Sequence, residues 1–391
     1  MARIAIFCDG TWNSPTIEQP THVVRLFDST PRTNAQHTHY FEGVGTGDEA
    51  PDFLAKALMK LGGGAFGWGL DAHIKRAYTA LCTQYEAGDE IFVFGFSRGA
   101  YTARSLVGMI RKCGIVADPT AENVEKAFRL YRKRGAENHP DALHVMQTRR
   151  SLSPHAATSE ADLSWRLTHP WPGVPGNHHK VQIAYLGVWD TVGSLGLPAP
   201  LLGPVARLWN KKYSFHDLTL TSLVKAARHA VALDERRVFF KPTLWSNLEA
   251  SREDGGLNKG DRSATRPYQQ QWFVGTHSMV GGSVKTARPL VCETLAWIAQ
   301  GAQDAGLEIA ADDLLDAAPD PLSNSLALSQ PPWLYKIAGH LLKWRAGPGH
   351  PIDLSSSAEA RIKGRHDYRP RSLQNLMPHL FGKPPTDGEE T

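Results

Sequence analysis

The chain has few cysteines, and it lacks both long basic runs and long hydrophobic runs. Its 391 residues include four cysteines with no Cys-x-x-Cys pair among them, so we expect reduced, packed thiols. No run of about 18 apolar residues occurs, and residues 1–4 begin directly with a strand pattern instead of an apolar signal region. We therefore expect neither a membrane span nor Sec export, and a protein that is cytoplasmic as synthesised.

The charge of the chain is close to balance. Its 43 basic and 39 acidic residues give a formal net charge of +4, and the excess is not gathered in basic runs with aromatic residues between them. Such runs are typical of nucleic-acid interfaces, so nucleic acid is not an expected partner. The length could hold two or three average domains, but α/β proteins often form one long core with insertions, and we expect one large core.

The most informative segment is Gly95-Phe96-Ser97-Arg98-Gly99, which ends an apolar run and leads into a helix-compatible stretch. The pattern Gly-x-Ser-x-Gly recurs by chance as a plain turn, so its surroundings decide its meaning. Here a strand precedes it and a helix follows it, which is the context of a nucleophile elbow. Gly95 and Gly99 let the chain reverse, Ser97 projects above the sheet, and the N–H of Arg98 points at a developing oxyanion.

Strands and helices alternate along the chain, which predicts an α/β fold with a mostly parallel central sheet flanked by helices. The expected strands are Arg3–Cys8, Thr38–Phe41, Glu90–Phe94, Lys180–Trp189 and Gln271–Gly275. The expected helices are Ala72–Tyr85, Tyr101–Ile110, Ala121–Arg134 and Leu290–Ala305. The segment Leu218–Leu233 has helical periodicity, and Arg237–Phe240 is short and β-prone.

This order of elements predicts one core with two additions. We expect the core over residues 1–310, with a charged helical cap or insertion at about 117–179. Helical pieces broken by prolines form a C-terminal extension over residues 311–383, packed on the core, and a polar tail at residues 384–391 is expected to be disordered.

An activated serine needs a base, and the base needs a carboxylate that orients it. Asp190 and His277 each follow a predicted strand, and the chain order Ser, Asp, His is the one that α/β-hydrolases use. Because the carboxyl ends of parallel strands share one edge, Ser97, Asp190 and His277 are expected to converge. The alternatives are an Asx-turn or helix cap for Asp190 and a structural role for His277.

The loop after the first strand, Asp9-Gly10-Thr11, has two interpretations. An Asp at a strand end followed by Gly-Thr is also found in phosphatases that form an aspartyl-phosphate, but their second carboxylate is missing because position 11 is Thr. We therefore assign Gly10 and Thr11, with Arg98, to an oxyanion hole. Asp9 is expected to support the turn, with cation binding as an alternative, and no metal or cofactor is expected.

Several motifs together resemble the uncharacterised α/β-hydrolase-domain family that includes phospholipase effectors of bacterial type VI secretion. The matching segments are residues 7–13, 43–47, 95–104, 187–193 and 229–235. The resemblance implies an α/β-hydrolase fold and a serine esterase, a phospholipase above all, with Ser97, Asp190 and His277 as its triad. It also implies a phospholipid or other ester substrate, a secretion-system or immunity protein as partner, and export that needs no signal peptide.

One position departs from the family pattern. Relatives tend to read His-Ser-Asp-Val-Gly-Gly, whereas this chain has Met279 in His277-Ser278-Met279-Val280-Gly281-Gly282. If the family's aspartate orients the histidine or holds an ion, that function is missing or moved here. A catalytically silent or partner-activated binding module on the same scaffold therefore remains the alternative to an esterase. Acyl transfer to an acceptor other than water is a third, weaker option.

The lipid interpretation also depends on the segment 332–345. Hydrophobic residues recur there at helical spacing, with Lys336, Lys343 and Arg345 available to meet anionic head groups, as in an interfacial helix. An ordinary helix packed on the core has the same pattern. Five basic residues further on, between Arg361 and Arg371, indicate either membrane attraction or a solvated face.

Overall fold

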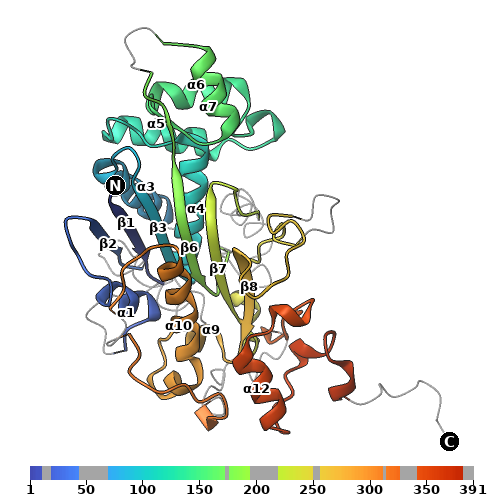
Figure 1. The fold of residues 1–391 in the computed structure, drawn as a ribbon. Helices are drawn as coiled ribbons and strands as arrows, with labels where there is room; N and C mark the ends of the chain where they lie inside the picture. The colour runs from blue at the N-terminus through green and yellow to red at the C-terminus, as the bar shows by residue number, and fades with distance from the viewer. Residues whose placement is uncertain are drawn as a thin grey trace, which may run out of the picture.

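The computed structural model describes residues 1–10, 19–43, 69–171, 176–193, 219–249, 256–310, 314–325 and 341–381. A six-stranded parallel sheet with the order β2-β1-β3-β6-β7-β8 forms its centre (Figure 1). The strands are β1 (Arg3–Cys8), β2 (Gln36–Phe41), β3 (Glu90–Phe96), β6 (Gln182–Trp189), β7 (Val224–Ala232) and β8 (Tyr268–Phe273). The predicted α/β class with a mostly parallel central sheet is confirmed.

Helices cover both faces of this sheet, which explains why β1, β3 and β6 are nearly continuous apolar runs. Along β1, Ile4 and Ile6 pack into one apolar cluster and Ala5 and Phe7 into the other. The first cluster contains α3 (Leu70–Gln84) and α4 (Arg98–Cys113), and the second contains α1 (His22–Asp28) and α10 (Arg288–Asp304). The strand order reverses between β1 and β3, where open α/β sheets carry their binding crevice.

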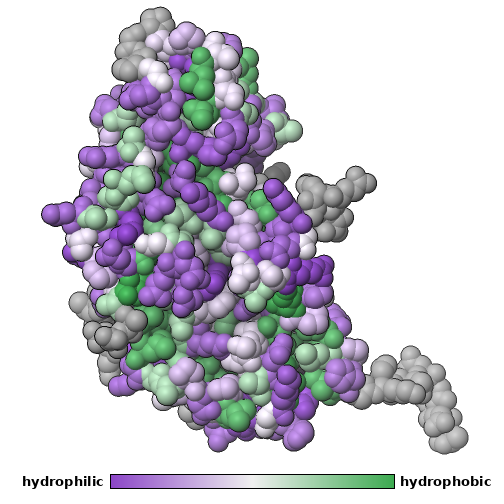
Figure 2. All heavy atoms as spheres, viewed as in Figure 1, coloured by the Kyte–Doolittle hydropathy of each residue, from purple (hydrophilic) through white to green (hydrophobic). Residues whose placement is uncertain are grey.

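The insertion predicted at about 117–179 lies at the amino edge of the sheet, above α4 in Figure 1. It comprises α5 (Ala121–Arg132), η1 (Ala136–Asn138), α6 (Leu143–Leu152), α7 (Glu160–Thr168) and the short strands β4 (Ala156–Ala157) and β5 (His179–Lys180). In its interior the carboxylate of Asp162 pairs with Arg149 and Arg166, all of them fully buried. Figure 2 shows polar side chains over much of its visible face. The insertion is therefore not a lid over the opposite, carboxyl edge.

The C-terminal segment packs beside β8. The remaining elements are η2 (Val238–Phe240), α9 (His277–Val280), η3 (Lys285–Ala287), η6 (Pro351–Asp353), α12 (Ser356–Gly364), η7 (Arg371–Leu373) and η8 (Pro378–Phe381). Leu354 forms a parallel bridge with Trp272 of β8. Both residues belong to a third apolar cluster, in which α12 buries Ala358 and Ile362. Of the segment 332–345 with its helical spacing, residues 332–340 lie outside the described residues, as does the tail at 384–391. Residues 342–345 are described and are not helical, since Leu342 forms an isolated bridge with Arg237. No helix in the described ranges has the length and hydropathy needed to cross a bilayer.

One element was predicted wrongly. The segment Leu218–Leu233 has helical periodicity, but Val224–Ala232 forms the strand β7 between β6 and β8. Its composition explains the error, because alanine is a strong helix former and four of its nine residues are alanine. The pairing partners on both sides, and not the local pattern, decide the conformation of this segment. A second, shorter prediction was only partly right: of the residues expected to be β-prone at 237–240, Arg237 forms an isolated β-bridge with Leu342, and Val238–Phe240 form a 3₁₀ turn.

Candidate active site

Ser97 stands between β3 and α4 in a strained conformation. Its φ is 57° and its ψ −119°, a region that side-chain-bearing residues rarely adopt. The flanking glycines make this turn possible. A Cβ on Gly95 would lie 2.5 Å from the carbonyl oxygen of Gly99, and a Cβ on Gly99 would lie 2.1 Å from the carbonyl oxygen of Cys8. Strand, serine turn and helix therefore have the geometry of a nucleophile elbow.

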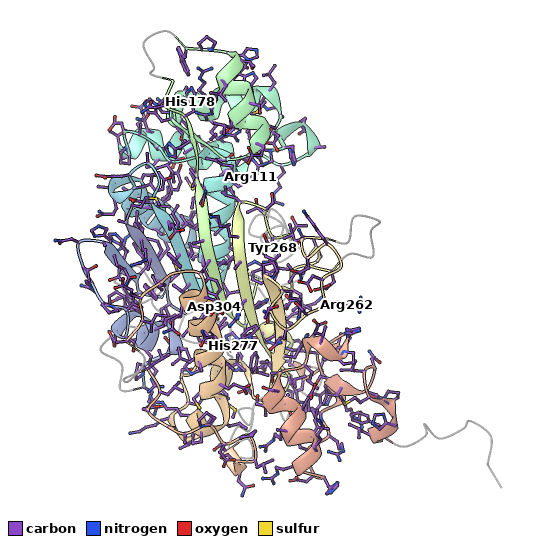
Figure 3. All side chains as sticks on the ribbon, viewed as in Figure 1. Arg111, His178, Arg262, Tyr268, His277 and Asp304 are labelled. Atoms are coloured by element: carbon purple, nitrogen blue, oxygen red, sulfur yellow. The ribbon has the colours of Figure 1, made fainter. Side chains whose placement is uncertain are left out.

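The structure brings Ser97, His277 and Asp190 together at the carboxyl edge. The Nε2 of His277 lies 2.9 Å from the Oγ of Ser97, and its Nδ1 lies 2.6 Å from the Oδ2 of Asp190. Asp190 follows β6, and His277 opens α9 just beyond β8. In Figure 3, His277 lies beyond one end of β8 and Tyr268 at its other end, while Arg111 and His178 lie toward the insertion. The chain of hydrogen bonds matches a serine hydrolase triad.

The Asp190 carboxylate is held by four donors. Its Oδ1 accepts from the N–H of Ala232 at 2.9 Å and from Nη1 of Arg345 at 2.6 Å. Its Oδ2 accepts from Nη2 of Arg345 at 2.8 Å and from His277. Burial alone would raise the pKa of Asp190, but the charge of Arg345 and the hydrogen bonds from His277 and Arg345 hold it well below its ordinary value. Asp190 is therefore a carboxylate with a fixed orientation.

His277 sits in an apolar setting. Its ring centre lies 4.8 Å from that of Phe96 and 4.7 Å from that of Phe240. Burial lowers the pKa of His277, and the hydrogen bond to Asp190 opposes that shift. The backbone N–H of His277, as distinct from its ring, donates to Oε2 of Glu235 at 3.2 Å. A neutral imidazole beside a serine hydroxyl is the state that a general base requires.

Met279, the departure from the family pattern, is fully buried. It belongs to the apolar cluster of Val274, Leu290 and Val291. A carboxylate at this position would be buried among aliphatic side chains. Asp190 already contacts the ring of His277, so orientation of the histidine here does not depend on an acid at position 279.

The carboxylate of Asp9, which directly follows β1, is held by three hydrogen-bond donors, and its support of the serine turn stays a prediction. The Asp9 carboxylate accepts hydrogen bonds from the hydroxyls of Thr21 at 2.8 Å and Tyr40 at 2.7 Å and from the N–H of Gly10 at 2.6 Å. Burial raises the pKa of Asp9 to about 6, and these three donors oppose the shift. The N–H of Gly10, predicted for the oxyanion hole, is therefore directed to a carboxylate in this structure. Thr11 lies outside the described residues.

Arg98, the third residue predicted for the oxyanion hole, is the first residue of α4. Its backbone N–H belongs to the first helical turn beside Ser97, where helix amides point along the axis toward the site. Burial lowers the pKa of its guanidinium to about 10. Of the three predicted donors, the backbone of Arg98 is the one whose described position fits the role.

Sequence reasoning missed Arg345 and Glu235 at this site. It left Arg345 either on an interfacial helix, available to anionic head groups, or on an ordinary helix packed on the core. The first alternative is wrong for Arg345, because its side chain is 8% exposed and bonded to Asp190. Its pattern, a basic residue at the end of an amphipathic stretch, carries no signal of a distant carboxylate partner. Arg361, also offered for membrane attraction, is buried and donates to the carbonyl oxygens of Pro321 and Ser323.

The described residues form no group of three or more His, Cys, Asp or Glu side chains that could hold a metal ion. Asp9, the carboxylate considered for a cation, is surrounded instead by hydrogen-bond donors. All four cysteines are buried and unpaired, and burial raises the pKa of Cys8 to about 12. None of them has the exposed, electropositive setting of a reactive thiol.

Comparison with known proteins places most of the chain in a described family. Residues 2–301 match the family described as "T6SS, Phospholipase effector Tle1-like, catalytic domain". The "Uncharacterized protein YEL023C" of Saccharomyces cerevisiae is 29% identical over 254 residues, which cover 63% of this chain and 33% of that protein. The family match ends before the segment that supplies Arg345.

Two solved structures are similar to this chain. A crystal structure of an uncharacterized protein from Pseudomonas aeruginosa has a TM-score of 0.42 and 15% identity, covering 79% of this chain and 46% of that one. The structure of the Tle1 effector bound to the VgrG spike from the type 6 secretion system has a TM-score of 0.37 and 15% identity, covering 73% of this chain and 51% of that one. The chain thus spans about a third to a half of the length of these three relatives.

Proposed function

The chain belongs to the family of Tle1-like catalytic domains of type VI secretion phospholipase effectors, and from this premise we propose that it is a serine esterase that cleaves phospholipids. Ser97 is the nucleophile, His277 the general base and Asp190 the residue that orients the histidine. The observation that carries the proposal is the pair of hydrogen bonds at 2.9 and 2.6 Å that joins these three side chains at a strained strand-to-helix turn.

In the proposed mechanism, Nε2 of His277 takes the Ser97 proton as Oγ attacks the acyl carbonyl carbon. The carbonyl oxygen becomes an oxyanion beside the backbone N–H of Arg98 and the loop after β1. His277 then donates the proton to the leaving alkoxide, and an acyl-enzyme forms on Ser97. Water, deprotonated by His277, attacks this ester, and collapse of the second intermediate returns the proton to Ser97 and releases the fatty acid.

The substrate class is supported by a cationic groove that has Arg345 in its lining. The groove is a depression of about 710 Å³. Its described lining holds the cations Arg236, Lys343 and Arg371 and no carboxylate, besides Arg345, whose charge is matched by Asp190. The other lining residues are Leu342, Trp344, Ala346, Gln374 and Asn375. A phosphodiester head group is an anion that such a lining attracts, whereas a neutral triglyceride gains nothing from it.

The test of this proposal is release of free fatty acid from mixed phospholipid vesicles, run beside a short-chain nitrophenyl ester. Wild type is compared with Ser97→Ala and with Ser105→Ala, a buried serine on the same helix that is not bonded to His277. Activity on vesicles that disappears in Ser97→Ala and persists in Ser105→Ala supports a phospholipase. Turnover of the short ester alone moves the substrate to small soluble esters.

A second candidate is a silent or partner-activated scaffold. The observation that favours it is the N–H of Gly10, which is bonded to Asp9 and not presented to a substrate. In a partner-activated enzyme of this kind, the oxyanion hole would be completed only when a lipid surface or a partner protein shifts the loop after β1. Rapid labelling of Ser97 by a fluorophosphonate argues against a silent scaffold, and labelling that appears only with vesicles present supports activation at a surface.

Partners and delivery follow from family membership as proposals. A phospholipase effector of type VI secretion is carried out of the producing cell by the secretion apparatus, and its producer needs protection from it. We propose a component of that apparatus and an immunity protein as binding partners, with export independent of a signal peptide. Co-purification of tagged full-length chain with purified spike protein tests the first, and loss of vesicle hydrolysis on addition of a candidate inhibitor tests the second.

A further inference from the structure

Arg345 reaches the triad from the C-terminal segment, outside the part of the chain that matches the family. We propose that Arg345 is a positioning residue, which fixes the orientation of the Asp190 carboxylate and, through it, the direction of the His277 ring toward Ser97. The inference rests on the proposed role of Ser97, Asp190 and His277 as a triad. It makes docking of residues 341–381 a condition for a competent active site.

The first argument is an account of the donors around the Asp190 carboxylate. Each of its two oxygens accepts two hydrogen bonds, and Arg345 supplies one of the two on each. Without Arg345, Oδ1 keeps only the N–H of Ala232, and Oδ2 keeps only the ring of His277. The carboxylate could then rotate, and the ring of His277 would lose the fixed partner that sets its direction toward Ser97.

The second argument is that Arg345 is itself held. It donates to the carbonyl oxygen of Ala232 at 2.8 Å and to that of Phe240 at 2.5 Å. The chain beside it is pinned by the bridge between Arg237 and Leu342, and the bridge between Trp272 and Leu354 fixes the segment further on. A bidentate, buried guanidinium that is held at both terminal nitrogens orients its partner better than a mobile surface cation.

The third argument concerns charge. Asp190, Glu235 and Arg237 act electrostatically on His277, and Asp190 in turn interacts with Arg345 and with the buried imidazole of His229. Asp190 and His277 titrate as a coupled pair, so a proton added to either one meets the fixed charge of Arg345. That charge disfavours the added proton, whichever of the two carries it. Removal of Arg345 must therefore raise the pKa at which the pair takes up a proton, and a purely structural arginine would not have this effect.

The test uses the full-length chain with Arg345→Ala and Arg345→Lys, and with Arg361→Ala as the matched control. Arg361 is a buried arginine of the same segment that bonds carbonyl oxygens away from the triad. For Arg345→Ala we expect kcat/KM to fall about 100-fold, as for other small displacements of catalytic groups. The acidic limb of the pH profile of kcat/KM should move to higher pH in this variant. Arg345→Lys should restore part of kcat/KM and part of the shift in pH, and guanidinium ion, added well below denaturing concentrations, should raise the activity of Arg345→Ala.

The result that overturns the proposal is an acidic limb of Arg345→Ala at the wild-type pH, or a loss of kcat/KM no greater than in Arg361→Ala. If Arg345→Ala does not fold, Arg345→Gln, which also removes the charge, decides by its kcat/KM and its pH profile. A second readout separates this proposal from the proposed function, because the Nδ1 proton of His277 can be followed by NMR without turnover. Its downfield resonance should weaken or shift in Arg345→Ala and not in Arg361→Ala. Absence of Ser97-dependent turnover in wild type would defeat the esterase proposal alone.

Discussion

A Cβ placed on Gly99 would lie 2.4 Å from the carbonyl oxygen of Asp9, closer than real side chains come to backbone. The first turn of α4 therefore rests directly on the end of β1. This contact sets the position of Ser97, two residues earlier, relative to the loop that carries Asp9.

Gly99→Ala should therefore destabilise the fold by about 2–3 kcal/mol, the upper range for overpacking, and should reduce activity by displacing Ser97. Urea unfolding and esterase assays check this. Gly108→Ala is the control on the same helix, because its Cβ would meet only a ring atom of Tyr131, at 3.3 Å. It should be nearly neutral, since alanine also favours the helix. Equal effects of the two substitutions would contradict the close approach.

Asp190→Asn should lower kcat by a factor on the order of 10³–10⁴, because an amide cannot stabilise the imidazolium or impose the correct tautomer on His277. It should also destabilise the fold by about 3–5 kcal/mol, since Arg345 is left as a buried cation without its carboxylate. Asp234→Asn is the control, because that half-buried carboxylate just after β7 bonds Gly275 and Tyr368 and not the histidine. A wild-type kcat in Asp190→Asn would remove Asp190 from the triad.

The acidic limb of the pH profile of kcat/KM should have its midpoint below pH 6.5, so that activity persists under mildly acidic conditions. The base must be neutral to accept the serine proton, and burial lowers the pKa of His277 from its ordinary value of 6.5. A lowered pKa keeps the imidazole neutral to lower pH, so the midpoint of the acidic limb should fall below 6.5. Initial rates with the short ester at subsaturating concentration measure this. A midpoint above 6.5 would show that the carboxylates around the ring outweigh its burial.

Stability should decrease as the pH falls from 6.5 toward 3. Burial lowers the pKa of both His22 and His229 to about 3, so over this range the unfolded chain binds protons that the folded chain does not. The contribution is fully present above pH 6.5. His229→Gln keeps a donor and an acceptor for Gln270 and Thr191 but does not titrate. In this variant the free energy of unfolding should vary less steeply with pH than in wild type, by up to about 1.4 kcal/mol per pH unit. The control is His144→Gln, a substitution on the exposed surface, which should leave that slope unchanged.

The cations of the groove should accelerate hydrolysis of anionic vesicles and have no effect on turnover of the short ester. Lys343→Gln combined with Arg371→Gln should lower hydrolysis of anionic vesicles several-fold and leave turnover of the short ester unchanged, because both cations line the groove and neither contacts the triad. Added salt should reduce the wild-type rate on the same vesicles. Lys363→Gln removes an exposed cation that pairs with Glu359 and does not line the groove. An equal loss in this control would mean that net charge, and not the groove, is responsible.

The parts of the fold that could be predicted are those in which local pattern and tertiary role agree. β1, β3 and β6 are buried apolar runs with turn residues after them, and α3, α4 and α10 carry apolar residues at helical spacing. β7 could not be predicted, because its alanines and basic residues favour a helix and only pairing with β6 and β8 makes it a strand.

The amino-acid sequence by itself determined the parallel α/β core and the positions of Ser97, Asp190 and His277 just after strands, because strand ends at one edge of a sheet are a local property of each segment. Only the tertiary structure decided that Arg345 holds Asp190, that Met279 is core and that the N–H of Gly10 is bonded to Asp9. Arg345 and Asp190 are 155 residues apart. A contact of that kind depends on how separate elements dock, and no periodicity or motif within either segment encodes its partner.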